Sequence, residues 1–319
     1  MARKVNISTI GARYHSLDPS LTLPQAVDEM ISHLKGKVNQ VLPDQPDLIV
    51  LPEYSDMPAN FSTEKRFAFY KERGDRILDC FSELASENHC YIIYPSVQEL
   101  EDGTWRNSIR LIGRDGQIAA TYYKNHPTIG ELEEGILSGE DAVVVNCDFG
   151  RVGFAICFDL NFDSLREKYV KAKPDLIVFS SMFHGGLMQS NWAYSCRSYF
   201  VGAIGGLTSS IISPVGEIIR STTNYYDYIT ETVNLDYAVV HLDNHWKLLR
   251  AMSEKYGPLV KMVDPGLVGA VLITSESNSV TMQDIVNEFG FELLDDYFSR
   301  ALARREADLQ ARSESIEAF

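Results

Sequence analysis

The chain of 319 residues carries a formal charge of −15, and 45% of its residues are hydrophobic, 11% aromatic and 23% charged. This composition is that of a folded globular protein and excludes disordered, collagen-like and membrane-spanning chains. The negative charge argues against nucleic-acid and membrane partners, because both favour clustered Lys and Arg. No apolar stretch near the amino terminus has signal-peptide length, so a cytoplasmic protein is expected.

Strand-like and helix-like segments alternate along the first part of the chain. The predicted order is a strand at 4–10, an amphipathic helix at 24–41, a strand at 47–54, a helix at 74–88 and a strand at 90–99. A hairpin follows, with strands at 105–113 and 117–124 joined across Asp115 and Gly116, which form a strong tight-turn signal. This segment therefore predicts a β-α-β-α-β unit that ends in a hairpin.

The same order begins again after residue 142. The predicted elements are strands at 142–147 and 151–158, a helix at 163–173, a strand at 175–181, a helix at 188–200, a strand at 201–207 and a hairpin at 212–219. Two such halves, each with continuous apolar strands, predict an α/β protein in which two sheets pack together with helices outside.

No segment is rich enough in Pro, Gly or Ser to be a linker, so one domain is expected over residues 1–275. Residues 276–319 are predicted to form a C-terminal helical extension, in which Leu294, Phe298 and Leu302 follow helical spacing. Packing of this helix on its own subunit and extension to a partner subunit are both compatible with the pattern.

The five cysteines form no C-x-x-C pair, which argues against both a disulfide framework and a zinc site. The histidines show no metal-ligand spacing either, so no metal site is expected. Reduced thiols are therefore expected, and a buried cysteine is most often a small hydrophobic residue.

Three polar residues stand where apolar strands end: Glu53, Lys124 and Cys157. Open α/β sheets place reactive groups at the carboxyl ends of their strands. A thiol becomes a nucleophile when a base removes its proton, and Glu53 is the candidate base. Lys124 and the backbone N–H of Phe158 are candidates to stabilise the negative charge that develops on the attacked group.

The segments that carry these residues, "LIVLPEY", "YYKNHP" and "RVGFAICFDLNF", resemble the glutamate, lysine and cysteine segments of the nitrilase superfamily of carbon–nitrogen hydrolases. The resemblance covers residues 4–275. It implies a four-layer α-β-β-α sandwich of two six-stranded sheets and a homodimer or higher homo-oligomer associated through the helices of the cysteine-bearing half. It also implies hydrolysis through a thioester at Cys157, without a cofactor.

Members of this family carry a second glutamate after the lysine, and "GELEEGILSGED" holds three candidates. A match to the family without gaps favours Glu133, a Glu-Gly pair typical of aliphatic amidases favours Glu134, and Glu131 is expected on a solvated face. The aromatic residues Tyr54, Phe158 and Phe183 resemble the lining of the acyl pocket. Phe158 could equally pack in the core.

The residues after the nucleophile bear on the reaction. The chain has Phe158 and Asp159 where nitrilases typically have Trp-Glu, which favours an amidase that cleaves a small-molecule amide to a carboxylic acid and ammonia. The alternatives are an N-carbamoyl (ureido) amidohydrolase, a nitrilase and a catalytically silent scaffold protein. A silent scaffold would have no need to keep all three of Glu53, Lys124 and Cys157.

Overall fold

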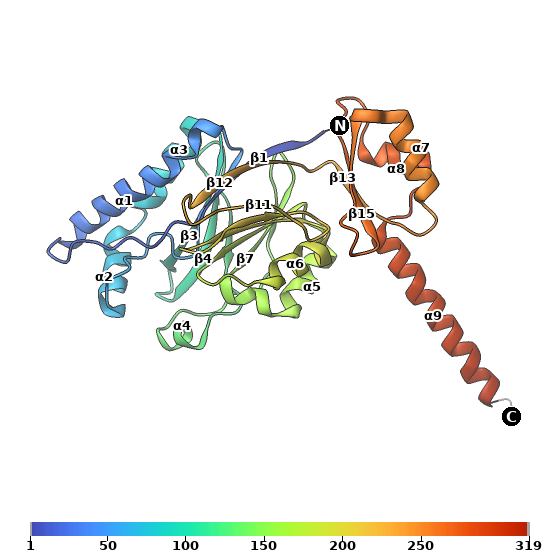
Figure 1. Ribbon diagram of the computed structural model, residues 1–319. Helices are drawn as coiled ribbons and strands as arrows, with labels where there is room; N and C mark the ends of the chain where they lie inside the picture. The colour runs from blue at the N-terminus through green and yellow to red at the C-terminus, as the bar shows by residue number, and fades with distance from the viewer. Residues whose placement is uncertain (1, 318–319) are drawn as a thin grey trace. The chain divides into compact units, whose positions relative to one another are not determined.

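The computed structural model describes residues 2–317 (Figure 1). The chain divides into two compact units, one over Val5–Val233 and one that combines the first four residues with Asn234–Phe319. The sequence predicts a domain boundary at residue 275, whereas the compact units divide between residues 233 and 234. The strand β15 (Ala270–Ser275) belongs to the smaller unit, because it pairs on both sides with other strands of that unit.

The larger unit contains two six-stranded sheets. The first sheet has the order β12 (Tyr228–Asn234), β1 (Lys4–Ile10), β2 (Leu48–Val50), β3 (Tyr91–Glu99), β4 (Trp105–Ile112) and β5 (Ile118–Tyr123). The second has the order β11 (Ile218–Ser221), β10 (Ser210–Ile212), β9 (Tyr199–Ile204), β8 (Leu176–Ser181), β7 (Arg151–Ile156) and β6 (Val144–Asn146). In each sheet the three central strands are parallel to one another, β1–β3 in the first and β7–β9 in the second.

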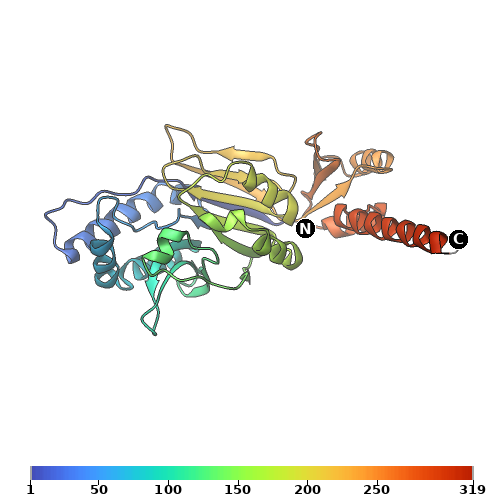
Figure 2. The same ribbon diagram turned by 90° about the horizontal axis from the view of Figure 1, so that it is seen from below.

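The two sheets lie face to face and are joined by buried hydrogen bonds. The Ser180 hydroxyl donates to the Leu51 carbonyl at 2.8 Å, and the Thr9 hydroxyl donates to the Gly202 carbonyl at 2.8 Å. Helices cover the outer faces: α1 (Leu23–Asn39), α2 (Thr63–Arg73) and α3 (Arg76–Asn88) on the first sheet, α5 (Asp163–Ala172) and α6 (Leu187–Cys196) on the second (Figure 1, Figure 2). The predicted α-β-β-α sandwich is confirmed.

Local sequence explains these elements. All six residues of β8 are buried, as expected for a continuous apolar strand covered on both faces. In α1 the buried residues Met30, Leu34 and Val38 follow helical spacing, and Thr22 with Gln25 forms a capping box at its start. The prediction of a helix to residue 200 was wrong: α6 ends at Cys196 because Arg197 adopts a left-handed φ of 52°, and β9 begins soon after.

The smaller unit contains an antiparallel sheet that the sequence analysis did not predict. Its order is β13 (Tyr237–His241), β15 and β14 (Val260–Val263). The helices α7 (Trp246–Tyr256), α8 (Met282–Phe289) and α9 (Leu294–Glu317) complete this unit. Leu294 is 1% exposed, whereas Phe298 and Leu302 farther along α9 are 41% and 59% exposed, so only the start of this helix is buried. Within residues 2–317 no helix has the length and apolarity to cross a membrane.

Candidate active site

The structure brings together the three strand-end residues that the sequence singled out. Glu53 follows β2, Lys124 follows β5 and Cys157 follows β7, so all three stand at the carboxyl ends of strands. Glu53 and Lys124 are each 1% exposed, and the Lys124 Nζ donates to Glu53 Oε1 at 2.8 Å. The Glu53 carboxylate and the Lys124 ammonium both act electrostatically on the Cys157 thiol, so the thiol belongs to the same cluster. A nucleophile, a carboxylate and an ammonium thus share one buried cluster.

The second carboxylate in this cluster is Glu131, and the prediction that this residue lies on a solvated face was wrong. Glu131 is buried, and its Oε2 accepts a hydrogen bond from Lys124 Nζ at 2.7 Å. Glu133 and Glu134 are exposed, and Glu134 instead accepts hydrogen bonds from Thr63 and Arg66. Neither therefore occupies the position beside the lysine that the sequence analysis assigned to one of them.

A capping box explains why Glu131 points inward. The short helix α4 (Ile129–Glu133) begins after Thr128, whose hydroxyl accepts from the Glu131 backbone N–H at 3.3 Å. In return Glu131 Oε2 accepts from the Thr128 backbone N–H at 2.7 Å. Residues 131 and 133 lie about 200° apart around a helix, so Glu133 faces the other way. The sequence "TIGE" carried this signal, since Ser or Thr followed three residues later by Glu marks a helix start.

Two further residues contact Glu53, the buried Asn107 and the partly buried Tyr14, and neither was predicted from the sequence. The Asn107 side chain on β4 donates from Nδ2 to Glu53 Oε1 at 2.8 Å and to Glu131 Oε1 at 2.9 Å. The Tyr14 hydroxyl donates to the Glu53 backbone carbonyl at 2.7 Å. No local pattern in the sequence marked Asn107, because its strand WRNSIRLI mixes apolar, hydroxyl and arginine side chains.

The nucleophile candidate stands in a strained turn. Cys157 has a φ of 46°, a left-handed conformation that costs a side chain with a Cβ about 1–2 kcal/mol. The buried carboxylate of Asp159 holds this turn, because its Oδ2 accepts from the Ile156 backbone N–H at 3.0 Å. Oδ2 also accepts from the Tyr122 hydroxyl at 2.7 Å, and Oδ1 accepts from the His126 backbone N–H at 2.8 Å. Asp159 therefore ties the cysteine turn to the segment that carries Lys124.

Burial controls the protonation of the thiol and of Glu53. Burial first, and the Glu53 carboxylate second, raise the pKa of the Cys157 thiol to about 12, while the Lys124 ammonium acts in the opposite direction. Burial also raises the pKa of Glu53, and Lys124 again opposes it. At neutral pH the thiol is therefore protonated. A carboxylate with a raised pKa is a better acceptor for its proton.

Lys124 and Glu131 form an ion pair beside Glu53, the candidate acceptor of the thiol proton. Burial lowers the pKa of Lys124, but the Glu53 and Glu131 carboxylates outweigh it and raise the pKa above the usual lysine value. Burial raises the pKa of Glu131, but Lys124 and the hydrogen bond from Tyr54 outweigh it and hold the pKa below its usual range. Both groups are thus charged at neutral pH. Transfer of the thiol proton to Glu53 moves charge within the cluster and leaves its total unchanged.

The three predicted lining residues have different surroundings. Tyr54 is buried, and its hydroxyl donates to Glu131 Oε1 at 2.6 Å, so its polar end supports the second carboxylate. Phe158 and Phe183 are each 36% exposed, which argues against core packing for Phe158. The Phe158 ring packs edge-on against Phe162 at 5.2 Å. The two exposed rings are free to contact a bound molecule, and they belong to the segments that follow β7 and β8.

The Phe158 backbone amide lies at the start of a short helix, in the residue after Cys157. Cys157–Asn161 forms a 3₁₀ helix directly after β7, and the first N–H groups of a helix have no partner inside that helix. Such an amide, next to the thiol, can donate to a negatively charged oxygen on an attacked carbon. Lys124 supplies a positive charge to the same cluster. The arrangement can therefore support attack of a thiolate on a carbonyl carbon.

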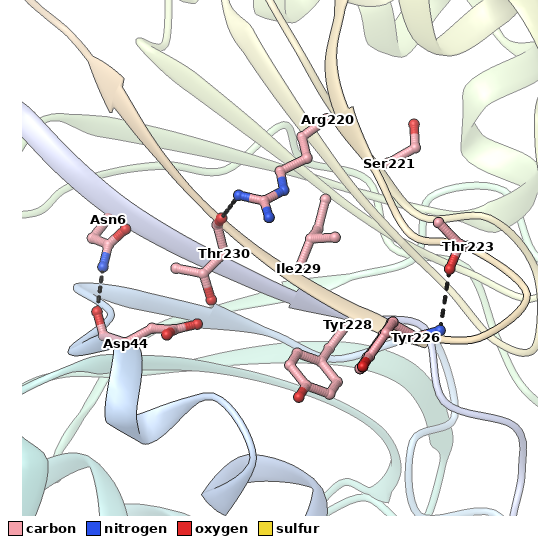
Figure 3. A pocket seen from close by; sticks show the side chains of 9 residues that line it. All are labelled: Asn6, Asp44, Arg220, Ser221, Thr223, Tyr226, Tyr228, Ile229 and Thr230. Carbon is pink, nitrogen blue, oxygen red and sulfur yellow. Dashed lines mark hydrogen bonds between the residues drawn. The ribbon is translucent and has the colours of Figure 1, made fainter.

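The described residues contain no metal centre in this cluster or elsewhere: within 2–317, no group of three or more His, Cys, Asp and Glu side chains could hold a metal ion. A surface pocket of about 650 Å³ lies beside β11 and β12 (Figure 3) and includes none of the predicted site residues. Its Arg220 donates to the Thr230 carbonyl at 2.8 Å and lies 3.4 Å from Glu231. This pocket is therefore distinct from the buried cluster.

The chain thus combines a two-sheet α/β sandwich with a buried cluster of Glu53, Lys124 and Cys157. The chain belongs to the carbon–nitrogen hydrolase family, whose model matches residues 17–240, and it is a hydrolase that acts on carbon–nitrogen bonds. The resemblance of the three sequence segments to the nitrilase superfamily is thereby confirmed.

Two relatives illustrate the similarity in sequence. A chloroplastic omega-amidase of Arabidopsis thaliana is 26% identical over 267 residues, which cover 73% of this chain and 70% of that protein. The omega-amidase NIT2 of Danio rerio is 25% identical over 219 residues, which cover 60% of this chain and 77% of that protein.

Solved structures agree on the fold. A carbon-nitrogen hydrolase from Helicobacter pylori G27 superposes with a TM-score of 0.62 at 15% identity and covers 73% of this chain and 90% of its own. Nit3 of Saccharomyces cerevisiae, a member of branch 10 of the nitrilase superfamily, has a TM-score of 0.60 at 17% identity and covers 81% of this chain and 96% of its own.

Proposed function

We propose that the protein is an amidase that cleaves a small-molecule amide to a carboxylic acid and ammonia through a thioester at Cys157. The observation that carries the proposal is the buried ion pair of Glu53 and Lys124, with 2.8 Å between Nζ and Oε1, and the buried Cys157 thiol in the same cluster. Glu53 acts as the base, and Lys124 with the Phe158 amide stabilises the oxyanion. Glu131, in place of Glu133 or Glu134, is the second carboxylate that positions Lys124.

The proposed reaction has two half-reactions. The thiol proton passes to Glu53 while the sulfur attacks the amide carbonyl carbon, and the negative charge moves to the carbonyl oxygen. Protonated Glu53 then returns the proton to the leaving nitrogen, the carbon–nitrogen bond breaks and ammonia departs from a thioester. Water loses a proton to Glu53 and attacks the thioester, and the released sulfur takes that proton back. One water is consumed for each acid and ammonia formed.

One observation argues against a nitrile substrate, and a second favours an amide. Cys157 is followed by Phe158 and Asp159 and not by the Trp-Glu pair typical of nitrilases. The two relatives described above are both named omega-amidases. An N-carbamoyl substrate would use the same base, nucleophile and lysine, and it is the second candidate.

Hydroxylamine is expected to intercept the thioester and to yield a hydroxamate from an amide substrate, because it competes with water for the acyl group. Amides or ureido compounds should exceed nitriles with the same acyl group by about tenfold in kcat/KM, which corresponds to about 1.4 kcal/mol in the transition state. The measurement is ammonia and hydroxamate formation by purified protein over matched amides, ureido acids and nitriles.

Three outcomes of that measurement would contradict the amidase. Faster turnover of nitriles than of their amides would identify a nitrilase within the same family. Ammonia release from amides without any hydroxamate would argue against a thioester. Carbon dioxide released together with ammonia from ureido acids, with amides inert, would favour the second candidate.

Among the acidic residues after the lysine, Glu131→Gln is expected to reduce kcat about a hundredfold or more, because it removes the negative partner of Lys124. Glu133→Gln, at the end of α4, and Glu134→Gln, directly after it, are matched controls and should change kcat less than about threefold, since both residues are exposed. The measurement is kcat for the three variants under one assay. Equal and mild effects at the three positions would refute the role of Glu131.

Two further features of the protein remain proposals. A homodimer or higher homo-oligomer that associates through α5 is implied by the family resemblance, and Val170 on this helix is 37% exposed and available for such a contact. A reducing compartment such as the cytoplasm suits a chain whose five cysteines form no disulfide.

A further inference from the structure

Asn107 occupies a central place among the charged groups of the site. Its side chain is completely buried on β4, and one nitrogen, Nδ2, donates to Glu53 Oε1 at 2.8 Å and to Glu131 Oε1 at 2.9 Å. An amide nitrogen carries two hydrogens, so both bonds form at once. Asn107 therefore bridges two carboxylates that would otherwise repel each other.

Lys124 makes a parallel bridge between the same carboxylates. Its Nζ donates to Glu53 Oε1 at 2.8 Å and to Glu131 Oε2 at 2.7 Å. The two bridges differ in chemistry, because Lys124 brings a charge, whereas the neutral amide of Asn107 brings hydrogen bonds only. These bonds favour the ionised forms of both acids without placing another titratable group beside them.

The orientation of the Asn107 amide follows from its neighbours. A rotated amide would place its oxygen against two carboxylate oxygens, so Nδ2 must face them. The opposite atom, Oδ1, is buried and has no hydrogen-bond partner among the described residues. A buried acceptor without a partner is unfavourable. Packing alone would not explain why the site keeps an asparagine whose Oδ1 has no partner. The need for an N–H donor between two carboxylates does explain it.

The bridges also distinguish the two oxygens of Glu53. Oε1 accepts from both Lys124 and Asn107, whereas Oε2 accepts only from the Met182 backbone N–H at 3.0 Å. A carboxylate oxygen has two lone pairs, so Oε1 is saturated and Oε2 retains one for another donor.

We propose that Asn107 is a positioning residue that holds Glu53 ionised and turns its Oε2 toward Cys157, so that Oε2 is the atom that accepts the thiol proton. This inference rests on the proposed roles of Glu53 and Cys157. It adds a residue on a fourth strand to the reaction and assigns the proton transfer to one oxygen.

The titration of Glu53 depends on every charged or titratable group that faces it. These groups come from the segments after β1, β2, β5 and β7 and from α4: Tyr14, Tyr54, Lys124, Cys157 and Glu131. None of them changes when Asn107 is substituted. A shift in the titration of Glu53 in an Asn107 variant therefore reports the loss of the amide bridge.

The experiment follows alkylation of Cys157 by iodoacetamide as a function of pH, with the Cys157 peptide quantified by mass spectrometry. Asn107→Leu retains the volume and removes both donated hydrogen bonds. The acid limb of the alkylation profile is expected to move upward by about one pH unit, because Glu53 protonates more easily without the bridge. With the best amide substrate, kcat should fall about tenfold to a hundredfold while KM changes less than about threefold.

Ser108→Ala is the matched control. Ser108 is the next residue of the same strand, is fully buried, and donates to the Ser96 carbonyl at 2.9 Å on the opposite face. Its loss should lower the melting temperature without moving the acid limb. Asn107→Asp, which retains the shape and adds negative charge, should move the limb upward as well, and it serves as the test if Asn107→Leu does not fold.

An acid limb that stays in place in a folded Asn107 variant overturns the inference, as does a shift of equal size in Ser108→Ala. Because alkylation needs no substrate, this result is separate from the amide assay. A shifted limb in a protein that hydrolyses no amide would leave the positioning role intact and remove the proposed function. Amide hydrolysis together with an unshifted limb would support the proposed function and remove the positioning role of Asn107.

Discussion

Replacement of Cys157 by alanine or serine is expected to reduce turnover by about 10⁵-fold or more, because loss of a covalent nucleophile removes the reaction path itself. Glu53 and Lys124 act electrostatically on the Cys157 thiol, whereas the charged neighbours of Cys80, Cys90 and Cys147 are other residues. Alanine and serine also carry a Cβ, so the left-handed φ of 46° at this position is equally strained in the variants. The fold should therefore persist, with a melting temperature within a few degrees of the unchanged protein.

Cys196→Ala is the control for this result. Cys196 is buried at the end of α6, and its removal costs packing without touching the charged cluster. Ammonia release should stay close to that of the unchanged protein, and a melting curve should show the larger loss of stability. Normal kcat in a folded Cys157 variant would sink the assignment of the nucleophile.

Glu53→Gln is expected to cost several orders of magnitude in kcat, beyond the roughly 10²–10⁴-fold of a single proton transfer, because the same group acts in both half-reactions. The substitution also disturbs the hydrogen bonds. The glutamine oxygen must face the donors of Lys124 and Asn107, so its NH₂ is placed against the Met182 backbone N–H, which is also a donor. The variant thus has no acceptor where the thiol proton would go.

The pH profile gives an independent check of this role. Burial raises the pKa of Glu53 above its usual value, so its ionised form is lost at a higher pH than for a solvated glutamate. Activity should accordingly fall as the pH drops through this raised pKa. The acid limb of kcat/KM, which reports the free enzyme, should disappear in Glu53→Gln. An unchanged limb in that variant would assign the titration to another group.

The parts of the site that could be predicted are those at the ends of strands. Glu53, Lys124 and Cys157 each directly follow an apolar run, and the carboxyl ends of parallel strands meet at one edge of a sheet. The same apolar runs and helical patterns predicted two packed sheets with helices outside. Such features depend on the period of side chains along a strand or helix, which is a local property of the chain.

Other parts depended on contacts between distant residues. Asn107 stands inside a strand, 54 residues from Glu53 in the chain. No local pattern marks it as the bridge between the carboxylates of Glu53 and Glu131. Glu131 did carry a local signal in its capping box, but its contact with Lys124 depends on how the loop after β5 folds back. The small three-stranded sheet was missed for a related reason, since β13 is separated from its partner β15 by α7 and β14, and both β13 and β14 are short.

The sequence by itself determined the sandwich and the three segments that carry Glu53, Lys124 and Cys157, because hydrophobic periodicity and strand ends are written in neighbouring residues. The tertiary structure alone decided which glutamate pairs with Lys124, which atom of Glu53 remains open to the thiol and which amide holds the two carboxylates together. Those choices are made by distances of 2.7–2.9 Å between side chains from separate strands and loops. Such distances arise only when the sheets have packed and the charges have lost their water.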